Sequence, residues 1–344
     1  MLIFYSLLAI LILSGLKYCK RGFNDEYLSY GMTNAVKGIF ILLVFIKHAT
    51  PYVINAGWSP AGISVELFDL VNNNVGQWIV AMFLFYSGYG VMESIRRKGH
   101  DYIQGLPRKR LLQVLVNFDI AVLIFIIAGL ILKKPLTFKQ CLLSLTGWES
   151  VGNSNWYIFI IMLMYLITFI AFCKERDGKY GRPLLAVAVL TFIFSIIMSY
   201  FKPEYWFNTM FCYTAGLCFS VYKDKIEKYT KSHYWQILIA VVISLLVIDR
   251  IPYHLKGLVY NAFSVIFCCM VVLLTMKFKI SSPVLLWCGS NLFPLYIYQR
   301  IPMIVFSSIN EGAFAAGYPF LFMVACLIVT ILIARAYKYI SIKF

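Results

Sequence analysis

Lys37 and His48 are two ionisable residues inside the apolar stretch VKGIFILLVFIKHATPY, which covers residues 36–52. His48 follows Lys37 by eleven positions, and at about 100° per residue both side chains lie on one face of a helix. The same spacing places them about 16 Å apart along the helix axis, so they do not share a hydrogen bond. A buried imidazole can act as a general base or as a nucleophile. Because an ionisable group in a membrane interior is costly, we interpret His48 as a candidate catalytic residue.

Both residues also have purely structural explanations, which the sequence leaves open. His48 can be a neutral imidazole that a neighbouring helix satisfies, and Lys37 can be an interfacial lysine whose ammonium reaches the membrane surface. Burial and the adjacent Lys47 charge both disfavour the imidazolium, so a neutral base is expected at physiological pH.

Two further charged residues stand within apolar segments. Asp119 lies in VNFDIAVLIF, about 13 Å from the inner end of its expected helix. It can pair with Lys47, orient His48 or satisfy a hydrogen bond within the bundle. Arg300 follows Gln299 and either faces an acceptor molecule or extends to the membrane surface. A second function class, a transporter or flippase for a glycan or small solute, would use His48, Lys47 and Asp119 as a proton or substrate path.

The elements that must position these residues are membrane-spanning helices. The 344-residue chain is 61% hydrophobic and 13% charged, and apolar blocks of roughly 15–25 residues recur along it, about the length that spans a bilayer. The period-2 segments of a membrane β-barrel are missing. The sequence therefore predicts an all-α, polytopic integral membrane bundle of about ten to eleven transmembrane helices. The expected spans cover residues 2–18, 34–55, 75–94, 111–132, 155–173, 184–201, 206–222, 234–249, 258–276, 284–309 and 318–340.

Any activity must reside in this bundle, because the longest connections, near residues 56–74 and 133–154, are short. We expect one integral membrane domain over residues 1–344, of which residues 1–30 form an N-terminal helix and loop. The opening segment lacks the basic region and the small-residue cleavage site of a signal peptide, so we interpret it as a retained helix.

The net charge of +16 has a membrane explanation rather than a nucleic-acid one. With alternate connections on opposite sides, most of the 31 lysines and arginines gather on one face, which the positive-inside rule assigns to the cytoplasm. This places the N-terminus outside. The nine cysteines lie mostly in apolar blocks without metal-ligand spacing, so we expect no metal site.

Five segments between residues 35 and 302 occur in an order that resembles the membrane-bound acyltransferase-3 family. They are AVKGIFILLVFIKHA, VAMFLFYSGYGVME, IRRKGHDYIQGLPRKRLLQVL, NWYIFIIMLMYL and LFPLYIYQRIP. The first is similar to the family's pattern of Arg or Lys, ten residues and His. The others resemble its Ser-Gly-aromatic run, the basic loop after it, its Trp-aromatic span and its late Tyr-x-x-His segment. The matching residues are Lys37, His48, Phe83, Ser87, Gly88, Tyr89, Trp156, Tyr157, Tyr165 and Tyr296.

The chain departs from the family pattern in two places that matter. Gln299 replaces the late histidine, so acid/base chemistry at that position is excluded here. Residues 1–30 add a helix to the ten that the resemblance implies.

The resemblance implies transfer of a short acyl group, usually acetyl from cytoplasmic acetyl-CoA, to a hydroxyl of a sugar or lipid-linked glycan. The expected location is the inner membrane of a bacterial cell, in contact with membrane lipids. His48 would be the catalytic base or the acyl carrier, with Lys37 as its partner in the motif. A basic mouth would hold the phosphates of coenzyme A; besides Lys37 it comprises Arg96, Arg97, Arg108, Lys109 and Arg110. A third class, a scaffolding subunit of an envelope-assembly complex, would tolerate loss of Lys37 and His48.

Overall fold

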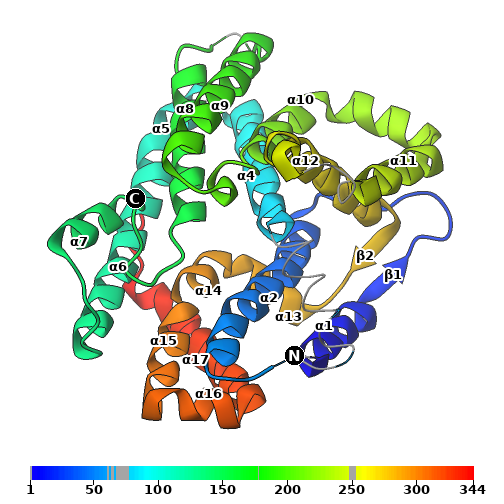
Figure 1. Cartoon of the computed structure of the whole chain (residues 1–344). Helices are drawn as coiled ribbons and strands as arrows, with labels where there is room; N and C mark the ends of the chain where they lie inside the picture. The colour runs from blue at the N-terminus through cyan, green and yellow to red at the C-terminus, as the bar shows by residue number, and fades with distance from the viewer. Residues whose placement is uncertain (1, 60–61, 63–65, 67–76, 177, 248–252) are drawn as a thin grey trace.

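The computed structural model of the chain describes residues 2–59, 62, 66, 77–176, 178–247 and 253–344. The fold is almost entirely helical, which confirms the predicted fold class (Figure 1). The helices up to residue 172 are α1 (Leu2–Ser14), α2 (Tyr30–Asn55), α4 (Trp78–Lys98), α5 (His100–Leu106), the π-helical turn η2 (Pro107–Leu112), α6 (Gln113–Ile131), α7 (Phe138–Leu145) and α8 (Trp156–Phe172). Those after it are α9 (Gly181–Phe201), η3 (Glu204–Trp206), α10 (Phe211–Ser232), α11 (Tyr234–Val247), α12 (Tyr253–Lys277), α13 (Pro283–Ser290), α14 (Leu292–Tyr298), α15 (Arg300–Ser307), η5 (Ile309–Gly312), α16 (Ala313–Gly317) and α17 (Pro319–Ile340).

The chain is a multi-pass membrane protein by the length and hydropathy of its helices. In the described part of the chain six helices are long and apolar enough to cross a membrane, and up to seven if the bent pair α10 and α11 is one span. The continuous helix formed by α5, η2 and α6 counts as one of them. Two apolar helices, α1 and α8, are shorter. Helix length thus supports fewer spans than the predicted ten to eleven.

The predicted continuous span over residues 284–309 is wrong, because the chain there forms the three short helices α13, α14 and α15. Two prolines explain the breaks. Pro294 has no N–H to donate to the Ser290 carbonyl, and α13 ends at Ser290. Pro302 likewise has no N–H to donate to the Tyr298 carbonyl, and α14 ends at Tyr298. Each proline then lies in the first turn of the next helix, where its missing N–H does no harm.

Glycines allow two pairs of helices to approach backbone to backbone. A Cβ at Gly88 of α4 would overlap the Tyr213 carbonyl of α10, and a Cβ at Gly216 of α10 would overlap the Phe85 carbonyl of α4. The helices α2 and α13 have the same reciprocal arrangement at Gly38 and Gly289. Small residues at such crossings let membrane helices pack closely without large apolar side chains. These two crossings hold α4 against α10 and α13 against α2.

Two three-residue strands were not expected in the predicted all-α fold. The strands β1 (Leu16–Tyr18) and β2 (Phe278–Ile280) pair antiparallel, with Leu16 opposite Ile280. The residues after β1 continue along the end of α12, where the Asn24 amide nitrogen donates to Thr275 O at 3.0 Å. The N-terminal segment is therefore fixed to a part of the chain that is distant in sequence.

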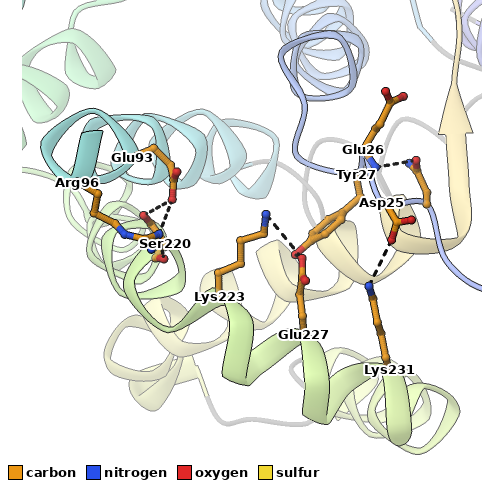
Figure 2. A network of polar contacts seen from close by, with 10 residues as sticks. Asp25, Glu26, Tyr27, Glu93, Arg96, Ser220, Lys223, Glu227 and Lys231 are labelled. Atoms are coloured by element: carbon orange, nitrogen blue, oxygen red, sulfur yellow. Dashed lines mark hydrogen bonds and ion pairs between the residues drawn. The ribbon is translucent and has the colours of Figure 1, made fainter. Parts of the chain in front are cut away.

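Charged side chains join the N-terminal segment to α10 at the end of the bundle where α4, α10 and α12 terminate, which we call the basic end (Figure 2). The Tyr27 hydroxyl donates to Glu227 Oε1 at 2.6 Å, and Lys231 Nζ lies 3.4 Å from Asp25 Oδ1. Nearby, Lys279 Nζ donates to Glu26 Oε2 at 2.7 Å. This hydrogen bond and the Lys279 charge lower the pKa of the Glu26 carboxyl below its ordinary value.

Candidate functional site

A cavity of about 220 Å³ lies beside His48, in the half of the bundle that contains the C-terminal part of α2. Five elements meet around it: α2, the start of α4, the start of α8, the short helix η3 and α14. We call this side of the molecule the far end, because α2 runs toward it from the basic end. The residues that line the cavity are Val44, Lys47, His48, Gln77, Val80, Trp156, Tyr205 and Tyr296.

The cavity has an exposed rim and a buried base. Tyr205 is 39% exposed, whereas Tyr296 is 1% exposed. Trp156 and His48 are partly buried between these extremes. The mouth therefore lies at Tyr205, and a molecule that enters there approaches the imidazole from the far end.

Three polar atoms of the cavity wall are buried without a hydrogen-bond partner among the described residues. They are His48 Nδ1, the Tyr296 hydroxyl and Gln77 Oε1. The rings of His48 and Tyr296 are neighbours, with centroids 6.2 Å apart. Buried polar groups in native proteins are nearly always paired. The three atoms around this cavity are therefore available to hydrogen-bond polar groups of a ligand.

Positive charge surrounds His48. Lys47 and Arg300 both lie close enough to act electrostatically on the imidazole. The Arg300 guanidinium is 6.0 Å from the centroid of the Tyr52 ring, and its Nε has no partner among the described residues. Burial and then the Arg300 charge lower the pKa of Lys134, which lies in the loop after α6. The positive charges of Lys47 and Arg300 favour negative charge that develops on a group bound beside the imidazole.

Gln299 and Asp119 lie outside the cavity wall. Gln299 is fully buried, and its Nε2 donates to Tyr296 O at 3.0 Å, so this residue supports the break between α14 and α15. Asp119 has a buried Oδ1 without a partner in the described part of the chain. The ion pair with Lys47 that the sequence allowed is not formed among the described residues.

Ser87 and Tyr157 form a layer behind the base of the cavity. The Tyr157 ring lies 5.3 Å from the Tyr296 ring, and Ser87 hydrogen-bonds both Tyr157 and Tyr165. Tyr89, in contrast, packs on α10, where its ring is 6.2 Å from that of Phe219. Of the residues on α4 that match the family pattern and that we expected to face the substrate, Ser87 thus supports the cavity and Tyr89 supports helix packing.

Lys37 lies nearer the basic end, on the same continuous helix as His48. Its Nζ is 3.4 Å from Asn34 Oδ1 and 5.8 Å from the centroid of the Tyr86 ring. Arg110 is close enough for its charge to act on Lys37, and Arg110 Nε donates to the Tyr102 hydroxyl at 3.2 Å. The fold therefore brings together Lys37 of α2 and Arg110 of η2, two members of the predicted basic mouth.

The other members of the predicted mouth have different surroundings. Arg96 is held by Glu93 at 3.0 Å and by the Ser220 carbonyl at 2.8 Å, so it links α4 to α10 (Figure 2). The Arg108 guanidinium lies 5.9 Å from the centroid of the Phe344 ring. Arg97 and Lys109 are exposed. Arg110 is the member whose position beside Lys37 best fits a shared ligand.

Ile41 separates the two ionisable positions of α2. It lies one turn beyond Lys37, and Val44 follows at the cavity wall. Ile41 is 2% exposed. A group that travels along this face from Lys37 to His48 must therefore pass the Ile41 side chain.

Gln77 and Tyr205 are cavity residues that the sequence did not reveal. Gln77 precedes the first turn of α4, and Tyr205 stands in the short η3 helix after α9. An aromatic residue between two spans is ordinarily explained by its preference for membrane interfaces. No periodicity or motif distinguishes these two residues from other interfacial ones.

Residues 33–335 match the model of a family described as an acyltransferase domain. No curated protein and no solved structure matches the chain.

Proposed function

The chain belongs to the acyltransferase 3 family, and from this premise we propose that it transfers acetyl from cytoplasmic acetyl-CoA to a hydroxyl of an envelope or lipid-linked glycan. The observation that carries this proposal is the cavity beside His48, where an imidazole nitrogen and the Tyr296 hydroxyl are buried and unpaired. Family membership supports acyl transfer, and the identities of the donor and the acceptor are what we propose.

The two ends of α2 suggest where each substrate binds. In the proposed orientation the basic end faces the cytoplasm of a bacterial cell and the chain lies in its inner membrane. Lys37 and Arg110 would bind the phosphates of acetyl-CoA as charge-assisted hydrogen-bond donors. The acceptor would enter the cavity from the far end. His48 lies between the two substrates.

His48 can catalyse the transfer by two routes. As a general base it takes the proton of the acceptor hydroxyl while that oxygen bonds to the acetyl carbon; the carbon–sulfur bond then breaks, and coenzyme A leaves as a thiol after taking a proton. As a nucleophile its nitrogen bonds to the acetyl carbon while the carbon–sulfur bond breaks, and coenzyme A leaves as a thiol with the proton of the ring. The acceptor oxygen then attacks the acyl-imidazole while the nitrogen–carbon bond breaks, and the hydroxyl proton returns to the ring.

The surroundings of His48 fit the negative charge that develops on the acetyl group in both routes. The carbonyl oxygen of the acetyl group becomes negative as the tetrahedral intermediate forms. The unpaired Tyr296 hydroxyl is a donor for that oxygen, and Lys47 and Arg300 supply positive charge nearby. Ser87 and Tyr157 hold the base of the cavity in place through their hydrogen bond.

The proposal is tested with purified protein in lipid vesicles by measuring coenzyme A release from acetyl-CoA. We expect His48→Ala to lower the rate about a hundredfold or more, the range of general acid–base catalysis. His233→Ala is the matched control, because His233 is an exposed histidine at the end of α10. Full activity of a folded His48→Ala protein would refute the catalytic role.

A transporter is the alternative outcome of the same experiment. Absence of any acetyl-CoA turnover by the wild-type protein, with uptake of a labelled glycan or solute into the vesicles, would favour transport through His48, Lys47 and Asp119. Ester-linked acetyl on surface glycans, compared in cells with and without the gene, identifies the acceptor class. Loss of acetyl with the gene supports the enzyme.

A further inference from the structure

Trp156 and Tyr205 form an aromatic pair at the mouth of the His48 cavity. Their ring centroids are 6.0 Å apart at an interplanar angle of 74°. Trp156 also packs against Tyr157, with ring centroids 6.3 Å apart. Both residues line the cavity, and Tyr205 is 39% exposed. The pair thus presents an aromatic surface directly outside the unpaired polar atoms of the cavity.

A rigid support holds Tyr205 in this position. Lys202 caps the C-terminus of α9. Its ammonium lies between two indoles, 4.1 Å from the centroid of Trp148 and 4.6 Å from the centroid of Trp206. Its Nζ also donates to Trp148 O at 2.6 Å. Cation–π contacts of this kind are strongest when the cation is desolvated, and the Lys202 side chain is 10% exposed. The helix η3, which carries both Tyr205 and Trp206, is therefore fixed to the loop before α8.

The wall of the cavity is divided into an apolar and a polar part. Trp156, Tyr205 and Val80 present apolar surface, whereas Gln77 Oε1 and His48 Nδ1 are unpaired polar atoms. A lipid tail would leave these polar atoms buried and unsatisfied, which is unfavourable. A pyranose ring has a C–H face that packs on aromatic rings and an edge of hydroxyl groups that pairs with polar atoms.

The size of the cavity further limits the ligand. Its volume of about 220 Å³ lies below the roughly 300–1,000 Å³ of pockets for drug-sized ligands. One sugar ring fits this space better than several. From these observations we propose that Trp156 and Tyr205 bind the ring of a single pyranose residue of the acceptor, with Gln77 accepting a hydrogen bond from one of its hydroxyls. This inference rests on the proposed function and adds the acceptor subsite.

The test measures sugar binding separately from acetyl transfer. The probes are the methyl pyranosides of glucose, galactose and N-acetylglucosamine, and binding to the purified protein is followed by saturation-transfer-difference NMR. We expect saturation of the ring C–H signals of at least one probe with the wild-type protein. Tyr205→Ala and Trp156→Ala should each weaken that binding about three- to tenfold, the range of one aromatic contact, and Tyr205→Phe should retain it.

Two further variants make the result decisive. Tyr200→Ala is the matched control, because Tyr200 is an aromatic residue near the same end of α9, is 80% exposed and lies outside the cavity wall. Lys37→Met should retain sugar binding although it weakens the use of acetyl-CoA, because Lys37 lies outside the cavity wall, so the failure of one proposal is distinguishable from the failure of the other. Absence of binding for all three probes, or unchanged binding in the Tyr205→Ala and Trp156→Ala proteins, would overturn the acceptor subsite.

Discussion

Gly88 of α4 and Gly216 of α10 lie at one crossing, where each occupies a position in which a Cβ would overlap a backbone carbonyl of the other helix. Gly88 follows Ser87, which hydrogen-bonds Tyr157 behind the cavity. The Ser-Gly pair therefore joins two functions in adjacent residues: the serine supports the site, and the glycine permits the helix contact that places it.

Gly88→Ala and Gly216→Ala should destabilise the protein by about 1–3 kcal/mol each, because a methyl group at either position forces the two backbones apart. Thermal unfolding of the detergent-solubilised protein measures this effect. Gly90→Ala is the control on the same helix, since no heavy atom lies within 4 Å of the position of its added Cβ. Equal unfolding temperatures for Gly88→Ala and Gly90→Ala would contradict the close crossing.

Tyr296→Phe should lower kcat by about ten- to a hundredfold with little change in the KM for acetyl-CoA, because it removes a donor that acts on the developing oxyanion. Tyr298→Phe provides the comparison: Tyr298 is also buried with an unpaired hydroxyl, yet it does not line the cavity. Steady-state kinetics of coenzyme A release distinguish the two. A similar loss in both variants would point to a structural effect instead.

Lys37→Met should raise the KM for acetyl-CoA about tenfold or more, because a charged hydrogen bond to a phosphate is lost. Lys37→Arg keeps the charge and should recover most of the affinity. Lys98→Met, at the exposed end of α4, controls for the loss of one positive charge. If Lys37→Met and Lys98→Met have the same KM for acetyl-CoA, Lys37 does not contact the acyl donor.

In the proposed donor route the thioester reaches His48 from Lys37 along the face of α2 that carries Ile41, and the larger side chain of Ile41→Trp should obstruct this route. We expect acetyl-CoA turnover to fall while methyl pyranoside binding at the far end is unchanged. Because overpacking a buried position costs about 1–3 kcal/mol, thermal unfolding of the variant has to be measured in parallel. Undiminished turnover in a folded Ile41→Trp protein would show that the donor reaches His48 by another route.

The helices of this fold were predictable because apolar blocks have a length and composition that lipid imposes. The shared face of Lys37 and His48 was predictable for a similar reason, since helical periodicity fixes it within one element. The helix breaks at Pro294 and Pro302 were not predicted, because the apolar run around these prolines is long enough for one span. The membrane orientation and the roles of the site residues remain predictions.

The rest of the candidate site depends on contacts between elements. Tyr205 reaches the cavity only because η3 packs against the start of α8, and the Lys202 ammonium between Trp148 and Trp206 supports this arrangement. The position of Tyr205 follows from tertiary packing, so no local sequence pattern predicts it. The same holds for Gln77, whose place beside the imidazole results from the way α4 begins against α2.

The pairing of β1 with β2 also sets the order in which the molecule can be completed. Asn24 and its partner Thr275 are 251 positions apart, so during synthesis the contacts of the segment around β1 cannot form until α12 has been made. Until then it has no sheet partner and no α12 carbonyls to bind. A ribosome that stalls before α12 would leave this segment open to proteolysis, which makes its anchoring a marker that α12 has been synthesised.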